Sequence, residues 1–483
     1  MAHARECVDK DADRLQLPRL DLGTPIEPRP QGCAIPLTAD QRYMFKAILR
    51  SDPRRQPLSV RMCASATRIT GPLSFGLLEG SIAGLLRRHE SLRTKFKTFE
   101  GVTTQHIDPP DKYRLTCVDL SALPKSEAES HAQRLILEFQ DQKIDLSIGP
   151  LFEAKLFKLA TEEHVLIILA DHMISDGISN ALLDKDIWQA YDDALGDEPA
   201  LLSTPLVQFA DYAVWWERTK ESRRVEHEDY WKQHRTDGVP TIIPVSPDIN
   251  ECSERGPVTH TSFGSALTAQ LRQFAERQQV SLSNVMLMIY ATAMSFWCDK
   301  EDLIIRCPVH GRHSKSELKN VIGFFSSFVG LRIKVDRRLT LQSLLTQVRD
   351  EMRNALDHRD LDRMLDLMPQ CLKTELEFHW RSARWPGQVV KKRSSLDQLI
   401  KRQPFLIRSP GLPRWHLKFW CIFNETPSDV CVTIRYQVHL LRPAAIEQFG
   451  NDLRFIAKSL IDRPLDQIYR VVLLRGREMY DAP

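Results

Sequence analysis

The clearest hydrophobic pattern in the chain lies between residues 165 and 194. Residues 165–170 (Val-Leu-Ile-Ile-Leu-Ala) are all apolar and rich in β-branched side chains, which predicts a buried strand. Residues 178–194 carry apolar side chains at helical spacing, which predicts an amphipathic helix. The stretch 171–177 (Asp-His-Met-Ile-Ser-Asp-Gly) therefore forms a tight loop held between two rigid elements.

Similar patterns recur along the chain. Residues 59–70 predict a strand, and the pair Gly71 and Pro72 separates it from a helix that carries Leu78, Ile82 and Leu85 on one face. The sequence further predicts helices at 266–278, 285–298 and 443–461, and strands at 303–305 and 430–438.

Proline and glycine divide the chain into segments. Residues 1–35 are charged and then proline-rich, which predicts a flexible or extended leader that does not pack as a unit. Residues 36–235 form the expected N-terminal lobe with the loop 171–177. Residues 236–260 form a linker rich in proline and glycine. Residues 261–483 form the expected C-terminal lobe.

Composition narrows the class of protein. The chain has 483 residues, 42% of them hydrophobic and 27% charged, as expected for a globular protein with an ample core. A net charge of +3 gives no indication of nucleic-acid binding. The ten cysteines are scattered, which predicts reduced thiols. We see no signal peptide, and the apolar run 285–298 is too short to span a bilayer, so a cytoplasmic protein that does not bind membranes is expected.

The loop 171–177 contains residues suited to acyl transfer. The transfer of an acyl group requires a group that draws the proton from the acceptor. His172 is the candidate, because the unperturbed pKa of a histidine side chain lies near working pH. Backbone N–H groups near Gly177 suit the stabilisation of an oxyanion, and glycine permits unusual backbone conformations and close approach of a ligand. We find no convincing nucleophile elbow with a serine or cysteine.

The chain resembles the condensation domains of nonribosomal peptide synthetases, within the chloramphenicol-acetyltransferase-like superfamily. The resemblance begins with His172, Asp176 and Gly177, which match a His-x-x-x-Asp-Gly motif after a buried strand. Four other segments are similar to family motifs in the same order: residues 37–42, 88–96, 209–215 and 321–325. It extends from about residue 36 to about 475.

The resemblance implies an α/β fold of two chloramphenicol-acetyltransferase-like lobes in a V, with a tunnel between them. It implies that His172 orients and deprotonates the acceptor, as a base or as a hydrogen-bonding anchor, and that the N–H of Gly177 stabilises the oxyanion. Asp176 is then a structural residue that pairs with an arginine of the other lobe, for which Arg312 is the best match. The motif's first histidine is Asp171 here, at a position that is usually structural.

Departures from the family pattern concern the acceptor. Ser326 and Ser327, with Phe328, replace the usual Val-Asn-Thr on the acceptor side of the tunnel. Residues 358–363 keep the histidine and aspartate of the sixth motif but lose its other residues. Both changes put the usual carrier-bound acceptor in doubt. The basic segment 381–414 is either a solvated loop or a landing site for an acidic carrier protein.

The sequence thus predicts a free-standing condensation enzyme, because no adenylation or carrier motif accompanies these segments. It would transfer an acyl chain from the phosphopantetheine thioester of a carrier protein to a small-molecule hydroxyl or amine, in natural-product biosynthesis, with ester formation slightly preferred. It would be a monomer with no cofactor or metal of its own. Alternatives are an acyltransferase that uses coenzyme A or a polyketide carrier, a heterocyclisation domain (Asp171, Asp176 and Ser179 fit its pattern), and a catalytically silent recruitment platform.

Overall fold

The computed structural model places most of the chain. It describes residues 23–50, 62–140, 142, 144–196, 204–233, 241–243, 258–312, 315–359, 364, 373–382, 396, 399–405, 419–438 and 440–471. The chain packs as two compact units. Unit 1 comprises residues 1–223, 310–326 and 384–410, and unit 2 comprises residues 224–309, 327–383 and 411–483.

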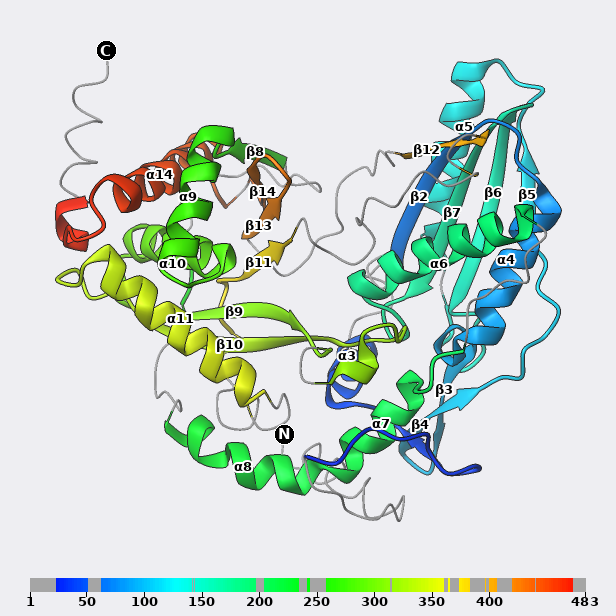
Figure 1. Ribbon diagram of the computed structural model, residues 1–483, viewed down its shortest axis with the longest axis horizontal. Coiled ribbons are helices and arrows are strands. Elements are labelled where there is room, and N and C mark those ends of the chain that lie inside the picture. Colours follow the sequence, from blue (N-terminus) through cyan, green and yellow to red (C-terminus); the bar gives the residue numbers. More distant parts are fainter. Residues whose placement is uncertain are drawn as a thin grey trace. The chain divides into compact units, whose positions relative to one another are not determined.

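Unit 1 is built on a five-stranded sheet with the order β12-β2-β7-β6-β5 (Figure 1). Its strands are β2 (Met62–Thr70), β5 (Thr116–Asp119), β6 (Phe152–Ala160), β7 (Glu163–Asp171) and β12 (Lys401–Pro404). The central strand β7 pairs antiparallel with both β2 and β6. The predicted strand at 59–70 is confirmed over its described residues as β2, and the predicted strand at 165–170 is confirmed as β7, which is longer at both ends.

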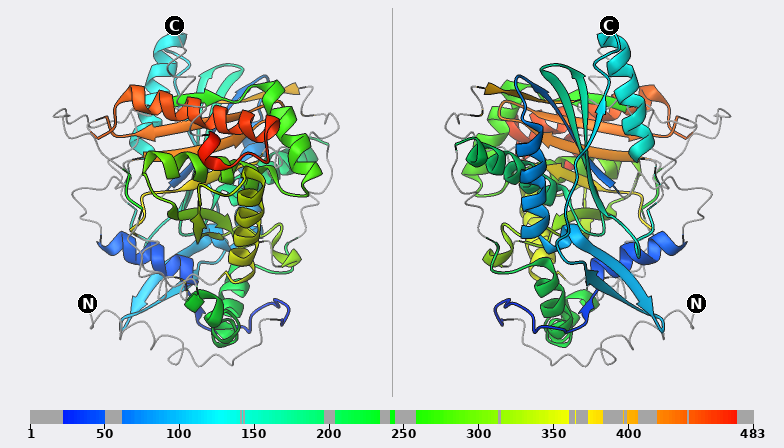
Figure 2. Two further views of the ribbon diagram at one scale, coloured as in Figure 1. Left: turned by 90° about the vertical axis from the view of Figure 1, so that its left-hand side faces the viewer. Right: turned by 90° about the vertical axis from the view of Figure 1, so that its right-hand side faces the viewer.

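The continuous apolar run in β7 is explained by helices on both faces of this sheet. Leu166 and Ile168 pack in one cluster with α4 (Phe75–Arg88) and α6 (Gly177–Leu195), whereas Ile167 packs on the other face with α5 (Lys125–Gln140). A strand covered on both faces needs no polar alternation. Figure 2 shows α4 and α5 on either side of these strands.

A small sheet completes unit 1, with the order β1-β4-β3. Unit 1 contains this sheet together with further helices. These elements are β1 (Ile35–Pro36), β3 (Thr94–Phe99), β4 (Val102–Ile107), α3 (Ala39–Arg50), the 3-10 helices η2 (Glu90–Arg93) and η3 (Ser316–Leu318), and α7 (Phe209–Arg218). Helix α8 (Lys220–Gln233) begins in unit 1 and ends in unit 2.

Part of the leader packs against the rest of unit 1. Arg29 forms ion pairs with Asp211 of α7 and Glu90 of η2, at 2.8 and 2.9 Å. The carbonyl oxygen of Thr24 accepts a hydrogen bond from the indole N–H of Trp215, and Ile26 is buried. Charge pairing and burial thus fix residues 24–35, although their composition resembles that of a linker. Residues 1–22 lie outside the described part.

Unit 2 contains a four-stranded sheet with the order β11-β13-β14-β8 and a two-stranded sheet with the order β10-β9. The strands are β8 (Val258–Ser262), β9 (Asp302–His310), β10 (Ser326–Lys334), β11 (Phe378–Arg381), β13 (Phe419–Glu425) and β14 (Val430–Tyr436). The helices are α9 (Ser265–Arg277), α10 (Leu282–Trp297), α11 (Leu341–Asp357) and α14 (Pro443–Asp462). Helices and strands thus occur in both units, and the predicted α/β class is confirmed.

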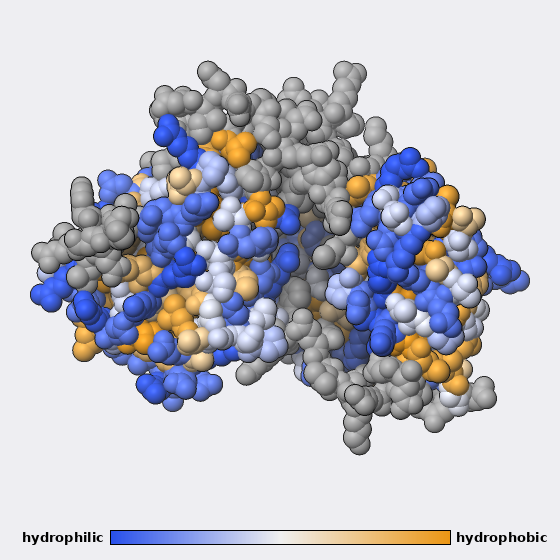
Figure 3. Space-filling view, turned by 90° about the horizontal axis from the view of Figure 1, so that it is seen from above, coloured by the Kyte–Doolittle hydropathy of each residue, from blue (hydrophilic) through white to orange (hydrophobic). Residues whose placement is uncertain are grey.

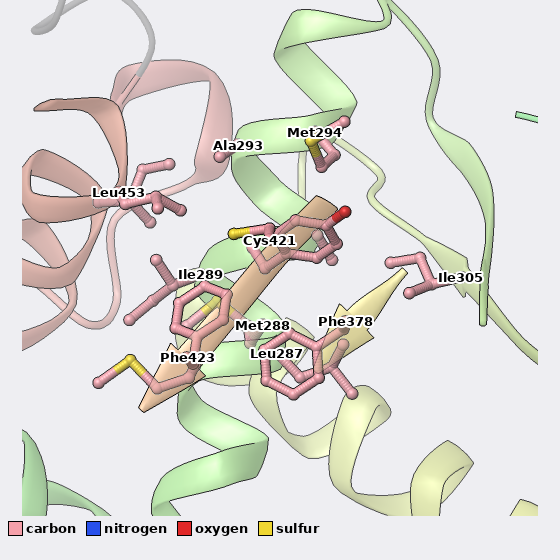
Figure 4. Close-up of a cluster of buried hydrophobic side chains, with 14 of the residues drawn as sticks. Leu287, Met288, Ile289, Ala293, Met294, Ile305, Phe378, Cys421, Phe423 and Leu453 are labelled. Carbon is pink, nitrogen blue, oxygen red and sulfur yellow. The ribbon is translucent and has the colours of Figure 1, made fainter. Parts of the chain in front are cut away.

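Helix α10 is the centre of the core of unit 2. Its residues 285–295 are buried without a polar stripe, because the four-stranded sheet and helices α9, α11 and α14 surround it. Figure 4 shows Leu287, Met288 and Ile289 of α10 beside Phe378 and Phe423 of the sheet. Within the described residues no single helix is long and apolar enough to cross a bilayer; α9 and α10 reach that length only together, across a bend of 109°.

The compact units differ from the continuous lobes expected from the sequence. The described residues of the segments 310–326 and 384–410 follow residue 261 in the chain but pack in unit 1. For the described part of the second segment the reason is strand pairing, since Lys401–Pro404 adds β12 to the edge of β2. Most of the predicted linker and of the basic segment 381–414, and residues 360–363 of the sixth motif, lie outside the described residues.

Hydrophilic side chains prevail on the visible face in Figure 3, and apolar ones form small separate groups among them. The arrangement of the two units in a V, and a tunnel between them, remain predictions.

Candidate active site

The loop between β7 and α6 is anchored on both sides. Met173 and Ile174 are buried in the core of unit 1, and the carbonyl oxygen of Met173 accepts a hydrogen bond from Gln41 of α3 at 2.9 Å. The Asp171 carboxylate accepts a hydrogen bond from the N–H of Met173 at 2.8 Å and is buried. Asp171 therefore closes the turn through its side chain, which fits the structural role expected for it.

The loop fixes the orientation of the His172 ring. Its Nδ1 lies 2.7 Å from the carbonyl oxygen of Ser175, which can only accept, so Nδ1 carries the proton and donates it. In the neutral ring Nε2 is then unprotonated, as a proton acceptor must be. Phe324 meets the imidazole edge-on, with ring centroids 5.0 Å apart. His172 as a whole is half-buried.

Asp176 is fully engaged by hydrogen bonds at the start of α6. Its Oδ1 accepts from the N–H of Ser179 at 2.7 Å and thereby caps the helix. Its Oδ2 accepts from Arg312 at 2.8 Å and from the N–H of Phe325 at 3.0 Å. Burial opposes ionisation of this carboxyl, but the charge of Arg312 and the hydrogen bonds outweigh it and lower its pKa. A carboxyl group with a lowered pKa is a poor proton carrier, so Asp176 suits a structural role.

Arg312 connects the start of α6 to the segment 310–326. Its guanidinium donates to Ser179 Oγ at 2.7 Å and to the carbonyl oxygen of Val321 at 3.0 Å, and it lies over the ring of Phe325. The predicted pairing with Asp176 is present, and Arg312 packs in the same compact unit as Asp176. These contacts, which join residues within unit 1, explain why the segment packs there.

The sequence did not indicate the parts played by Ser179 and Gly323. Ser179 Oγ donates to the carbonyl oxygen of Gly323 at 2.8 Å and accepts from its N–H at 3.0 Å. A Cβ on Gly323 would lie 2.1 Å from the ring of Phe209, so only glycine fits there. Ser179 was noted for a different pattern and Gly323 within a motif. Only the fold brings them together.

Gly177 occupies the first position of α6. An N–H at this position has no partner within the helix, and the helix dipole favours negative charge beside it, so it can stabilise an oxyanion. Gly177 is not among the glycines with positive φ, so its backbone conformation does not require glycine. The absence of a side chain still allows the close approach of a ligand.

The structure thus brings His172, Asp176, Gly177 and Arg312 together in unit 1. Ser326 is half-buried at the start of β10, and Ser327 is buried at the next position, which belongs to unit 2. Their place on the acceptor side of a tunnel remains a prediction. In the described part of the chain no cluster of three His, Cys, Asp or Glu side chains could hold a metal ion.

The chain belongs to the condensation domain family, whose model matches residues 35–481. It is similar to one of the linear gramicidin synthase proteins of Brevibacillus parabrevis, with 28% identity over 94% of this chain and 6% of that protein. It is also similar to the phosphinothricin tripeptide synthetase PhsC of Streptomyces viridochromogenes, with 28% identity over 92% of this chain and 41% of that protein. The chain therefore spans less than half the length of either relative.

Solved structures with the same fold include the X-domain from teicoplanin biosynthesis and the SgcC5 protein from Streptomyces globisporus. The X-domain has a TM-score of 0.75 and 18% identity, covering 92% of this chain and 99% of that chain. SgcC5 has a TM-score of 0.69 and 17% identity, covering 89% of this chain and 100% of that chain. The fold is thus that of condensation domains, which consist of two chloramphenicol-acetyltransferase-like lobes.

Proposed function

We propose that this chain is a condensation enzyme that moves an acyl group from the phosphopantetheine thioester of a carrier protein to a small-molecule hydroxyl or amine. The oriented ring of His172 carries this proposal, because the hydrogen bond from Nδ1 to Ser175 leaves Nε2 as the proton acceptor. Membership of the condensation domain family supports the same reaction class.

The proposed reaction proceeds through a tetrahedral intermediate. The acceptor oxygen or nitrogen attacks the thioester carbonyl carbon as its proton passes to Nε2 of His172. The negative charge that forms on the carbonyl oxygen is stabilised by the N–H of Gly177 at the start of α6. The intermediate then collapses, the carbon–sulfur bond breaks, and the proton from His172 goes to the pantetheine sulfur. An ester or amide and a free thiol result.

The test mixes purified protein with an acyl-loaded carrier protein and candidate alcohols and amines, and follows the products by mass spectrometry. Replacing His172 by alanine should reduce the rate at least about 100-fold, the usual contribution of a general base. The control is His106→Ala, which removes an exposed histidine of β4 in the same unit and should leave the rate unchanged. Equal rates for wild type and His172→Ala would disprove the proposed role.

The donor is tested with a parallel set of reactions. Acyl-coenzyme A and an acyl-loaded polyketide carrier each replace the peptidyl carrier. A faster reaction with either would identify that donor instead.

A second candidate is a catalytically silent platform that recruits other proteins. Two observations favour it: Asp171 occupies the position of the motif's first histidine, and the fold matches the teicoplanin X-domain, which has been solved in a complex with OxyB. The Asp171 carboxylate accepts a hydrogen bond from the N–H of Met173 and so keeps the loop closed. The substitution therefore does not by itself favour a silent platform. Absence of product with every donor and acceptor, together with an intact fold, would favour the platform.

A further inference from the structure

One face of the four-stranded sheet in unit 2 carries cations without matching anions in the described part of the chain. The opposite face, with Phe378, Cys421 and Phe423, packs against α10 (Figure 4). Because successive side chains of a strand alternate between faces, the first face carries His379 and Arg381 on β11, Trp420 on β13 and Arg435 on β14. We call these four residues the cationic face.

Arg381 and Arg435 have no acidic partner among the described residues. The carboxylate of Glu377 is already shared by Arg306 and by Nε2 of His379. Glu425 accepts from Ser382 and pairs with Arg272, and Asp429 accepts from Ser262 and Thr268. The acids on or beside these three strands are therefore occupied elsewhere.

Other donors on the cationic face also lack acceptors. The Nε of Arg435 and the indole N–H of Trp420 are both buried and have no hydrogen-bond partner in the described structure. The Arg435 guanidinium lies 5.6 Å from the Trp420 ring centroid, and the His379 ring meets Trp420 edge-on at 5.1 Å. A buried donor without an acceptor lowers stability, so such groups usually have a partner.

The charges on this face do not balance. Burial and the charges of Arg381 and Arg306 lower the pKa of His379 to about 3, so that ring is neutral. Arg381 is exposed, yet partial desolvation and the nearby charge of Arg435 lower its pKa. Burial also lowers the pKa of Arg435. Arginine stays charged despite such shifts, so two guanidinium groups repel each other across the face.

We propose that the cationic face binds the carboxylate or phosphate group of a small molecule between Arg381 and Arg435. Guanidinium groups bind both oxyanions through paired N–H donors, and the flat Trp420 ring offers an apolar surface for the rest of the ligand. A carboxylate on an acceptor and the phosphate of a pantetheine group both have this chemistry. The site is independent of the acyl-transfer proposal, because binding is measured without donor or carrier.

The test uses three probes on the full chain: 3-phenylpropanoate, its neutral amide, and inorganic phosphate. Binding is followed by the NMR signal of the Trp420 indole N–H, identified as the indole signal missing from Trp420→Phe. The acid or phosphate should shift this signal in a saturable way, whereas the amide should not. A shift by the acid alone assigns a carboxylate, a shift by phosphate alone assigns a phosphate group, and shifts by both assign a general oxyanion site.

Variants show whether the arginines make the site. Arg381→Gln and Arg435→Gln should each weaken binding about 10- to 100-fold, because each variant removes charge-assisted hydrogen bonds to the anion. Arg454→Gln, which removes an equal charge from α14 in the same unit, should bind as the wild type does. Thermal melting checks that each variant is folded. The proposal is overturned if no charged probe shifts the signal, if the amide binds as well as the acid, or if both arginine variants keep wild-type affinity.

Discussion

At the scale of single residues, two aspartates in the site have structural roles and one histidine is suited to accept a proton. Asp171 and Asp176 have carboxylates engaged by backbone N–H groups, whereas His172 keeps one ring nitrogen for a proton. An ion pair as deeply buried as Asp176 with Arg312 fixes geometry, and removing one partner leaves the other charge uncompensated.

The Arg312→Ala variant should therefore lose stability at least as markedly as activity. The loss should be about 3–5 kcal/mol, the usual cost of breaking a buried pair, measured by urea denaturation. Arg332→Ala, which breaks the more exposed pair with Asp302, should cost less than about 1 kcal/mol. A stable Arg312→Ala protein with full activity would refute the structural role assigned to the pair.

The lowered pKa of Asp176 predicts a dependence of stability on acid. A carboxyl whose pKa is lower in the folded state stabilises the protein above its unfolded pKa, and this contribution is lost as the pH falls through the folded pKa. Between about pH 5 and about pH 3 the wild type should lose more stability than Asp176→Asn does, as measured by urea denaturation at each pH. Parallel losses in the two proteins would show that Asp176 does not contribute.

At the scale of elements, the contact between Gly323 and α7 should tolerate little added volume. In Gly323→Ala the new Cβ would collide with Phe209, and overpacking of this kind costs about 1–3 kcal/mol. Gly80→Ala is the matched change, since an exposed helical glycine in α4 with open space should gain roughly 0.5–1 kcal/mol. Thermal melting of the two variants should move in opposite directions, and equal shifts would contradict the packing.

Local patterns predicted elements well and their partners poorly. The strand β7, the loop and α6 were predicted because periodicity is a local property of the sequence. The edge strand β12 was missed, because its residues 401–404 are largely polar and become a strand only by pairing with β2. The same holds for Ser179 and Gly323, which lie 144 residues apart and share two hydrogen bonds.

At the scale of the whole molecule, unit 1 is assembled from three separate stretches of the chain. A fragment of residues 36–235 should therefore fail to fold cooperatively, because it contains Asp176 without Arg312 and β2 without β12. Its near-ultraviolet circular dichroism should lack the sharp thermal transition of the full chain. A fragment that melts cooperatively at the wild-type temperature would show that the later segments are dispensable.

The late position of β12 in the chain also governs what a ribosome exposes during synthesis. The strand β2 is synthesised early, and its edge stays unpaired until residues 401–404 have been translated. An unpaired strand edge attracts other nascent chains. Chaperones that cover this edge during synthesis should therefore improve the yield of native protein, whereas slower translation should lower it.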